Sequence, residues 1–174
     1  TVGEAAGVPV IAYNLPGATG MNLDRPFYRE LLERTDAVKY IKDTSGSIEQ
    51  AVGLIFNLGD VIGTFIGWDT IVLPAFSAGA AGSIWGAPNF APKECVQIYD
   101  LAKRGETAAA FDIFKRLWNV FDFLGKEGYA VSTKAAAHAA GIDLGAPRAP
   151  FSELEPKKLD ELRKLVADSG LNYA

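Results

Sequence analysis

Short apolar segments alternate with helical patterns through the first half of the sequence, and this alternation constrains the fold more than any other feature. Strands are predicted at residues 8–13, 38–42, 61–66 and 81–85, with helices between them at 24–34, 47–58 and 70–77. Short connections between alternating strands and helices imply parallel pairing of the strands and right-handed crossovers. An α/β fold built from four βα units is therefore expected.

Four βα units are half of an eight-stranded barrel. An open four-stranded parallel sheet is the alternative, but it needs helices on both faces and protected edges. We therefore predict that residues 1–90 form the second half of a (β/α)₈ TIM barrel. Residues 4–7 resemble the last turn of a helix closed by Gly7, and Met21 is the only methionine, so we expect a C-terminal portion of a longer protein.

The pattern changes to helices alone from Pro92 onward. Helices are predicted at residues 92–103, 106–124, 129–140 and 157–167, and a proline-containing linker at 145–150 precedes the last of them. The second of these helices has an aromatic and aliphatic face that includes Phe114, Leu117 and Phe121. We expect residues 91–174 to form a helical C-terminal appendage.

Composition excludes several classes of function. A net charge of −4 gives no basic surface for nucleic acid. The single cysteine, Cys95, excludes an intrachain disulfide, and the single histidine, His138, argues against a histidine-based metal site. Both lie in predicted helices, where packing or surface roles are expected. No apolar stretch reaches membrane-spanning length and no signal-peptide pattern opens the chain, so we expect a cytoplasmic protein.

Unusual residues stand where the predicted strands end, which is where barrel enzymes carry their chemistry. Lys42 ends the segment 38–42, and Tyr13 ends the segment 8–13. Apolar surroundings favour the neutral amine of a lysine, which can attack a ketone, and a tyrosine hydroxyl can move the protons. Alternation along a strand places Lys42 on the same face as Val38 and Tyr40, and Lys39 on the other face.

Simpler interpretations of the same residues remain open. Lys42 could be a solvated cation paired with Asp43, and Tyr13 could be a core aromatic side chain. The segment Gly67-Trp68-Asp69 could be only a turn in which Asp69 caps the next helix. The glycines of residues 79–86 could serve only close packing, and no basic residue accompanies them for a phosphate site.

Four motifs, in order, carry a resemblance to a known family. They are Tyr-Asn-Leu-Pro-x-x-Thr-Gly from Tyr13, Tyr-Ile-Lys-Asp-Thr-Ser-Gly from Tyr40, Gly-Trp-Asp from Gly67 and Ala-Gly-x-Ala-Gly-Ser-Ile from Ala78. Over essentially the whole chain, the sequence resembles the dihydrodipicolinate synthase / N-acetylneuraminate lyase family. The resemblance implies a class I pyruvate-type aldolase or lyase on a (β/α)₈ barrel with a C-terminal helical domain, commonly a homotetramer that uses no cofactor.

The resemblance also implies roles for individual residues. Lys42 would form a Schiff base with pyruvate or another 2-keto acid, and Tyr13 would be the proton shuttle. Thr44, Gly67 and Asp69 would lie along the distal part of the substrate. Ile84 would lie against the keto-acid end, and an aldehyde would be the second substrate.

Two departures from the family pattern modify this expectation. Ala18 stands where dihydrodipicolinate synthases typically have a carboxylate-binding arginine. An aldolase or dehydratase for a sugar-derived or hydrophobic keto acid is therefore favoured, with Trp68 and Trp85 shaping the pocket. The family's first four strands and their Gly-Thr-Thr-Gly-Glu-type loop have no counterpart, so the isolated chain is expected to be inactive. The alternative is a non-catalytic half-barrel that depends on oligomerisation and binds a small acid.

Overall fold

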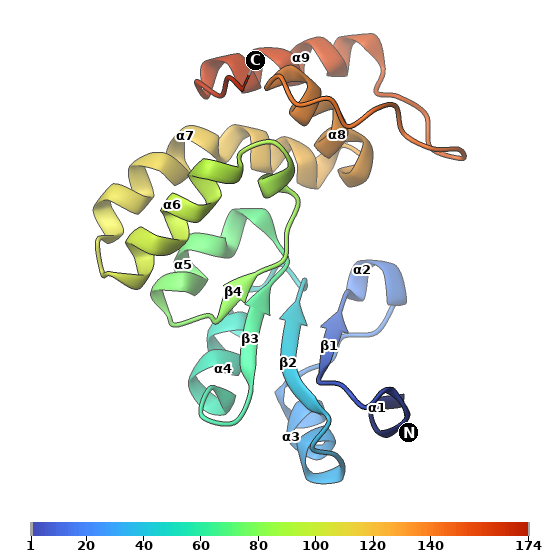
Figure 1. Cartoon of the computed structure of the whole chain (residues 1–174), viewed down its shortest axis with the longest axis vertical. Coiled ribbons are helices and arrows are strands. Elements are labelled where there is room, and N and C mark those ends of the chain that lie inside the picture. The colour runs from blue at the N-terminus through green and yellow to red at the C-terminus, as the bar shows by residue number, and fades with distance from the viewer. Residues whose placement is uncertain (1, 174) are drawn as a thin grey trace. The chain divides into compact units, whose positions relative to one another are not determined.

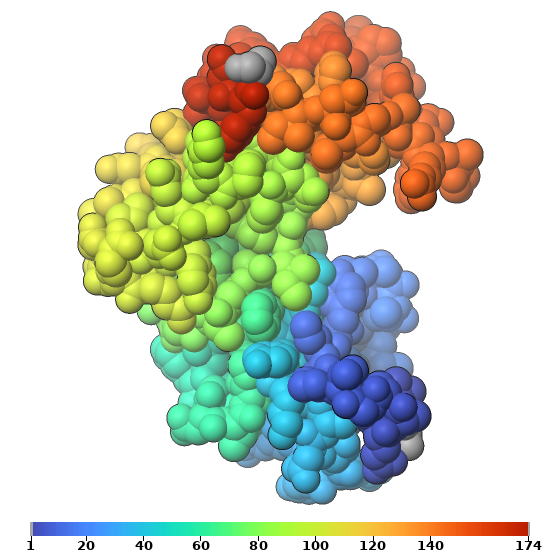
Figure 2. Space-filling model, in the orientation of Figure 1, coloured from blue at the N-terminus to red at the C-terminus, as the bar shows by residue number. Residues whose placement is uncertain are grey.

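The computed structural model describes residues 2–173, which fold into two compact units. The first unit runs to Trp85 and contains all the strands of the described chain, and the second begins at Gly86 and is helical (Figure 1). In Figure 2 the first unit is coloured blue to green, and the second continues from light green to red. The sequence led us to propose a domain boundary after residue 90. The first compact unit of the structure ends at Trp85.

The first unit consists of βα units in parallel order, as half of a TIM barrel requires. Its strands pair in the order β1-β2-β3-β4, and every pair is parallel. The elements are α1 (Val2–Ala6), β1 (Val10–Asn14), α2 (Pro16–Thr19), α3 (Arg25–Arg34), β2 (Val38–Asp43), α4 (Ile48–Leu58), β3 (Gly63–Ile66), the 3₁₀ turn η1 (Asp69–Ile71), α5 (Val72–Ser77) and β4 (Gly82–Ser83). The predicted alternation is confirmed, although β4 is shorter than expected and the short helix α2 was not predicted.

Side-chain caps fix where the helices of this unit begin. The carboxylate of Asp24 accepts a hydrogen bond from the backbone N–H of Phe27, and Pro26 lies in the first turn of α3, where its missing N–H costs nothing. The hydroxyl of Ser47 accepts from the N–H of Gln50 at the start of α4. Ser47 therefore caps α4, and the start predicted for this helix at residue 47 agrees with the structure.

The two faces of the sheet differ in how they are covered. On one face, strand residues such as Ile41 pack against α3 and α4 in the cluster Tyr28, Val38, Ile41, Leu54, Leu58 and Ile62. On the other face, Ile11, Tyr13 and Tyr40 keep 44%, 47% and 40% of their surface exposed. The sheet therefore has one buried face and one half-exposed apolar face.

An irregularity in strand pairing corrects one expectation from the sequence. Val10 pairs with Val38, but the next residue, Ile11, pairs with Tyr40, so Lys39 is an extra residue in β2. The simple alternation of faces is interrupted there. Val38 consequently packs in the buried cluster with Ile41. Strict alternation had predicted that Val38 shares a face with Lys42, and this prediction is wrong.

The second unit is a set of packed helices. Its elements are the 3₁₀ turn η2 (Ala87–Asn89), α6 (Pro92–Lys103), α7 (Thr107–Lys126), α8 (Tyr129–Ala139) and α9 (Pro156–Asp168), close to the predicted bounds. The rings of Phe114 and Phe121 lie 5.5 Å apart on the buried side of α7, and Phe90 packs against Phe121 at 6.4 Å. Aromatic packing along α7 thus forms much of this unit's core.

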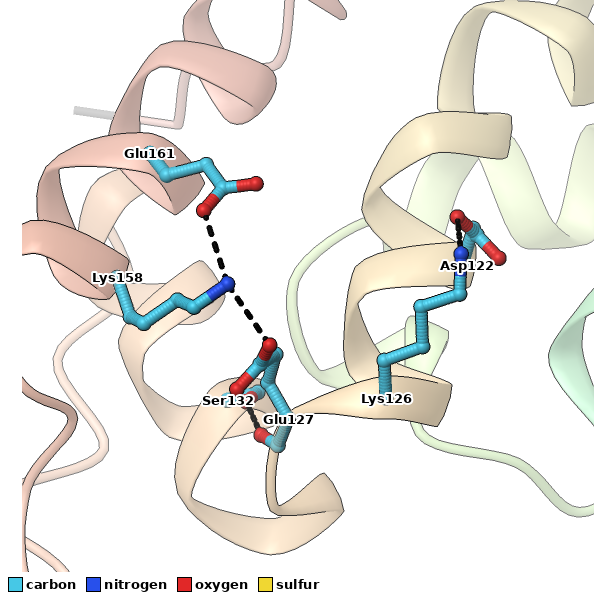
Figure 3. Close-up of polar contacts among 6 residues, drawn as sticks. All are labelled: Asp122, Lys126, Glu127, Ser132, Lys158 and Glu161. Carbon is cyan, nitrogen blue, oxygen red and sulfur yellow. Dashed lines mark hydrogen bonds and ion pairs between the residues drawn. The ribbon is translucent and has the colours of Figure 1, made fainter.

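Polar contacts connect α9 to the turn between α7 and α8 (Figure 3). The Nζ atom of Lys158 lies 2.9 Å from a carboxylate oxygen of Glu127 and 3.3 Å from one of Glu161. The hydrogen bond to Glu127, and then that to Glu161, raises the pKa of Lys158. The Ser132 hydroxyl donates to the backbone carbonyl of Glu127, and so anchors the first turn of α8 to the same residue.

Residues 2–173 include no helix that is both long enough and apolar enough to cross a membrane.

Candidate active site

The carboxyl ends of the four strands lie in one row, because backbone hydrogen bonds join each strand end to the next. These bonds run from Thr44 N to Asn14 O (2.9 Å), from Gly67 N to Asp43 O (2.8 Å) and from Ile84 N to Ile66 O (2.9 Å). The residues expected to carry chemistry on β1, β2 and β3 therefore share one edge of the sheet. Asp69 opens η1 just beyond this edge, and Ile84 follows β4 directly.

Lys42 and Tyr13 face each other at this edge. They are register partners across β1 and β2, and Nζ of Lys42 lies 4.0 Å from the centroid of the Tyr13 ring. An ammonium over the face of an aromatic ring is attracted by the ring's electron density. Tyr13 is half exposed among the residues that the structure describes. Asp43 is the next residue along β2 and is fully buried on the other face of the sheet, so it is not a solvated partner for Lys42.

Thr44 and Gly67 lie against the Lys42 side chain. A Cβ atom added to Gly67 would be 2.0 Å from Oγ1 of Thr44 and 2.7 Å from Cε of Lys42. Only glycine leaves room for both groups, since real Cβ atoms do not approach other atoms this closely. Oγ1 of Thr44 is buried and has no hydrogen-bond partner in the described chain. The arrangement places an unpaired hydroxyl beside the lysine stem.

Trp68 covers the turn that follows Lys42. Gly46 in that turn has a φ of +74°, which favours glycine, and a Cβ atom there would lie 3.2 Å from the indole of Trp68. Asp69 is 4% exposed and belongs to the η1 turn, whose preceding residue is Trp68. The helical turn begins at Asp69 itself, directly after Trp68.

The structure brings together Tyr13, Lys42, Thr44 and Gly67, and it places Asp69 and Ile84 on neighbouring loops at the same edge. Sequence reasoning missed the side-chain partners of Asp43. The Asn14 amide donates to its carboxylate at 2.7 Å, and both residues are fully buried. A polar residue directly after each apolar strand segment was the available signal.

A separate pocket of about 400 Å³ lies in the helical unit. His138 and Arg163 are among its lining residues, together with acidic groups such as Asp143. Lys134 also lines it, but its Nζ donates to the carbonyl of Leu144 at 2.6 Å and thereby holds the loop after α8. We therefore infer that Lys134 has a structural role in this loop. Among residues 2–173, no group of three His, Cys, Asp or Glu side chains could hold a metal ion.

Parallel βα units with polar residues gathered at the carboxyl ends of the strands are typical of the TIM-barrel class of protein. Within that class, the family model described as the Dihydrodipicolinate synthetase family matches residues 1–169. The chain belongs to this family.

Individual relatives agree with this assignment. The chain is 32% identical over 180 residues to an "Uncharacterized DapA-like lyase" of Pyrobaculum arsenaticum, covering 97% of this chain and 59% of that protein. It is 32% identical over 165 residues to a 4-hydroxy-tetrahydrodipicolinate synthase of Clostridium novyi, covering 95% of this chain and 55% of that protein. The chain thus spans less than two thirds of the length of these relatives.

Solved structures show the same fold. The dihydrodipicolinate synthase of Acinetobacter baumannii, determined in complex with pyruvate, superposes with a TM-score of 0.91 at 27% identity. The superposition covers 98% of this chain and 58% of that one. The expected fold, the second half of a TIM barrel followed by C-terminal helices, is confirmed.

Proposed function

We propose that this chain carries the imine-forming part of a class I lyase that acts on pyruvate or another 2-keto acid. The single observation that carries the proposal is the position of Lys42 Nζ, 4.0 Å from the Tyr13 ring centroid at the carboxyl edge of the sheet. Membership of a family with lyases and synthases among its relatives supports it.

The proposed chemistry starts with the free amine of Lys42. The ring of Tyr13 attracts only the charged form, so loss of the proton releases the amine to attack the keto carbon. Addition gives a carbinolamine, which loses water to leave the imine. The protonated imine draws electrons from the adjacent carbon, so that a proton can leave it and the resulting enamine can attack an aldehyde. Cleavage is the reverse, and the Tyr13 hydroxyl gives and takes the protons.

Four further residues are proposed to bind the substrate. Thr44 is the best supported, because a buried hydroxyl without a partner gains a hydrogen bond when a substrate oxygen approaches. Gly67 leaves the space beside it. Asp69 and Ile84 are proposed from the family resemblance and from their place at the same edge of the sheet, Asp69 for the distal part and Ile84 for the keto-acid end.

Two features favour a substrate other than that of dihydrodipicolinate synthesis. Ala18, in α2, offers no cation for a second carboxylate. Trp68 adds a broad apolar surface next to the turn at Gly46. A sugar-derived or hydrophobic keto acid, in an aldolase or dehydratase reaction, fits these residues better.

The alternative function is a non-catalytic half-barrel that binds a small acid. The half-exposed apolar face with Ile11, Tyr13 and Tyr40 favours association in either case, with another copy or with the N-terminal half of a barrel. A homo-oligomer is proposed on this basis.

The test is the intact mass after incubation with pyruvate and borohydride, which reduces an imine to a stable adduct. Lys42→Ala should abolish a single adduct, whereas Lys39→Ala, three residues earlier on the same strand, should retain it. If this chain gives none, the assay is repeated on a fusion to the N-terminal portion of the Pyrobaculum relative. An adduct at Lys42 in the fusion supports the lyase, and its absence there supports the binding module.

A further inference from the structure

The residue pair directly after Tyr13 and Lys42 lies on the opposite face of the sheet. Asn14 and Asp43 are register partners, as Tyr13 and Lys42 are, and both are fully buried. Successive side chains on a strand point to opposite faces, so the two pairs occupy consecutive rungs of one ladder. Whatever fixes the second pair also fixes the backbone of the first.

Asp43 is the centre of a hydrogen-bonded group. Its Oδ1 atom accepts from the amides of Asn14 at 2.7 Å and Gln50 at 2.9 Å. Its Oδ2 atom accepts from the hydroxyl of Ser45 at 2.7 Å. A carboxylate taken out of water needs such donors, so each of these bonds is costly to lose.

The group extends to the loop before α3. The Asn14 amide also donates to Asn22 at 2.9 Å, and its oxygen accepts from the backbone N–H of Leu23 at 3.0 Å. The amide of Asn22 donates to Gln50 at 2.7 Å. We call Asn14, Asn22, Asp43, Ser45 and Gln50 the Asp43 cluster. It joins the ends of β1 and β2, the loop before α3 and the first turn of α4.

We infer that the Asp43 cluster is a positioning device that keeps the tips of β1 and β2 in register, so that Tyr13 covers Lys42 on the other face. The inference deepens the proposed function and rests on it for its catalytic meaning. Lys42 and Tyr13 are the catalytic residues in this scheme. Asn14, Asp43 and Gln50 act through them, as outer groups that hold reacting side chains commonly do.

Three substitutions separate the hydrogen bonds of the cluster from its charge. Asp43→Ala removes the acceptor and leaves the amides of Asn14 and Gln50 without it. Asp43→Asn keeps one oxygen for these two amides, and its new N–H₂ group can donate to Ser45. Gln50→Ala removes a partly exposed donor to Asp43 and replaces Asp43→Ala in the test if that variant does not fold. Circular dichroism shows which variants are folded.

The readout is the rate at which an aryl sulfonate reagent, trinitrobenzenesulfonate, modifies Lys42 relative to Lys39, measured by peptide mass spectrometry. Lys39 is exposed on the same strand and serves as the internal reference. In the unaltered chain the ring of Tyr13 shields Lys42, and Tyr13→Ala defines the ratio for an uncovered lysine. We expect Asp43→Ala and Gln50→Ala to raise the ratio at least threefold toward that limit, and Asp43→Asn to stay near the unaltered value.

An unchanged ratio in folded Asp43→Ala or Gln50→Ala chains overturns the inference, and so does an Asp43→Asn chain that behaves like the alanine variant. Trapping with pyruvate and borohydride is run in parallel. Where the unaltered chain forms the adduct, Asp43→Ala should slow it about 10–100-fold, as small displacements of reacting groups do. The labelling ratio is measured without substrate. It therefore tests the positioning role of the Asp43 cluster even if no adduct forms and the proposed lyase chemistry fails.

Discussion

The Nζ atom of Lys42 lies over the ring of Tyr13, 4.0 Å from its centroid, across the β1–β2 ladder. The contact joins two segments of the chain that meet only because the strands are parallel neighbours. It also distinguishes Lys42 from Lys39, which lies at the irregular step of the same strand and is exposed.

Removing only the hydroxyl of Tyr13 should slow imine formation without moving its site. Tyr13→Phe keeps the aromatic face over Lys42 but can no longer transfer protons, and general acid–base groups typically contribute about 10²–10⁴-fold. The measurement is the rate of adduct formation with pyruvate and borohydride, in this chain or in the fusion. A Tyr13→Phe rate equal to that of the unaltered protein would exclude the proton-shuttle role.

A methyl group at Gly67 should disrupt the site. The added atom would collide with Thr44 Oγ1 and Lys42 Cε, so Gly67→Ala should lower the free energy of unfolding by about 1–3 kcal/mol and reduce adduct formation at least tenfold. Gly17→Ala is the matched control, because its Cβ would meet no atom within 4 Å. Urea unfolding of both variants provides the comparison, and equal effects would contradict the crowding at Gly67.

Tyr28→Phe should leave the protein as stable or more stable. Tyr28 is fully buried, its hydroxyl has no hydrogen-bond partner in the described chain, and burial followed by the negative charge of Asp43 raises its pKa. Removing a buried hydroxyl that makes no hydrogen bond should raise the free energy of unfolding by about 1 kcal/mol. A loss of more than about 1 kcal/mol in urea unfolding would mean that the hydroxyl makes a stabilising bond after all.

Tyr173 should make folding sensitive to alkaline pH. Burial, and then the hydrogen bond to Glu94, raises the pKa of Tyr173 to about 12 from a usual value near 10. Between these pH values the folded chain holds a proton that the unfolded chain releases. The stabilisation of the folded state by the protonated Tyr173 hydroxyl is therefore complete below about pH 10 and is lost as the pH rises toward about 12.

Comparison with Tyr173→Phe isolates this stabilisation. The pH dependence that all other titratable groups give to the free energy of unfolding is the same in both proteins and cancels in the difference. At pH 8 the variant should be the less stable, because the bond to Glu94 is absent. The gap in urea midpoints should narrow steadily between pH 10 and pH 12. A gap of constant size across that range would show that Tyr173 is not protonated preferentially in the folded state.

The half-exposed apolar face of the sheet should drive association. Ile11→Lys places a charge on this face and should raise the dissociation constant for self-association at least tenfold in sedimentation equilibrium. Phe56→Lys, on α4 at 71% exposure, is the matched control and should have little effect. A monodisperse monomer before any substitution would contradict the proposed oligomer.

Local chemistry accounts for the features that the sequence predicted well. The start of α4 at Ser47 and the bounds of α6 depend on neighbouring residues, and both predictions agree with the structure. The extra residue at Lys39 was not predicted, because it is defined only by the pairing of β2 with β1. The short β4 likewise depends on which of its residues bond to β3.

The candidate site divides in the same way. Lys42 and Tyr13 stand out in the sequence, because a lysine or tyrosine after an apolar strand segment is a local pattern. The need for glycine at position 67 could not be predicted, because it follows from the close approach of Thr44 Oγ1 in the folded structure. The Asp43 cluster comes from β1, β2, α4 and two loops, and no local pattern groups these residues.

Side-chain type and spacing along the chain were enough to predict the order of strands and helices, the start of α4 at Ser47 and the family motifs. The folded structure was needed to show that Tyr13 covers Lys42, that Gly67 makes room for Thr44 and that Asp43 faces away from the lysine. The physical reason is that strand register and hydrogen bonds between distant segments fix distances of a few ångströms, and the free energy of packing selects that register.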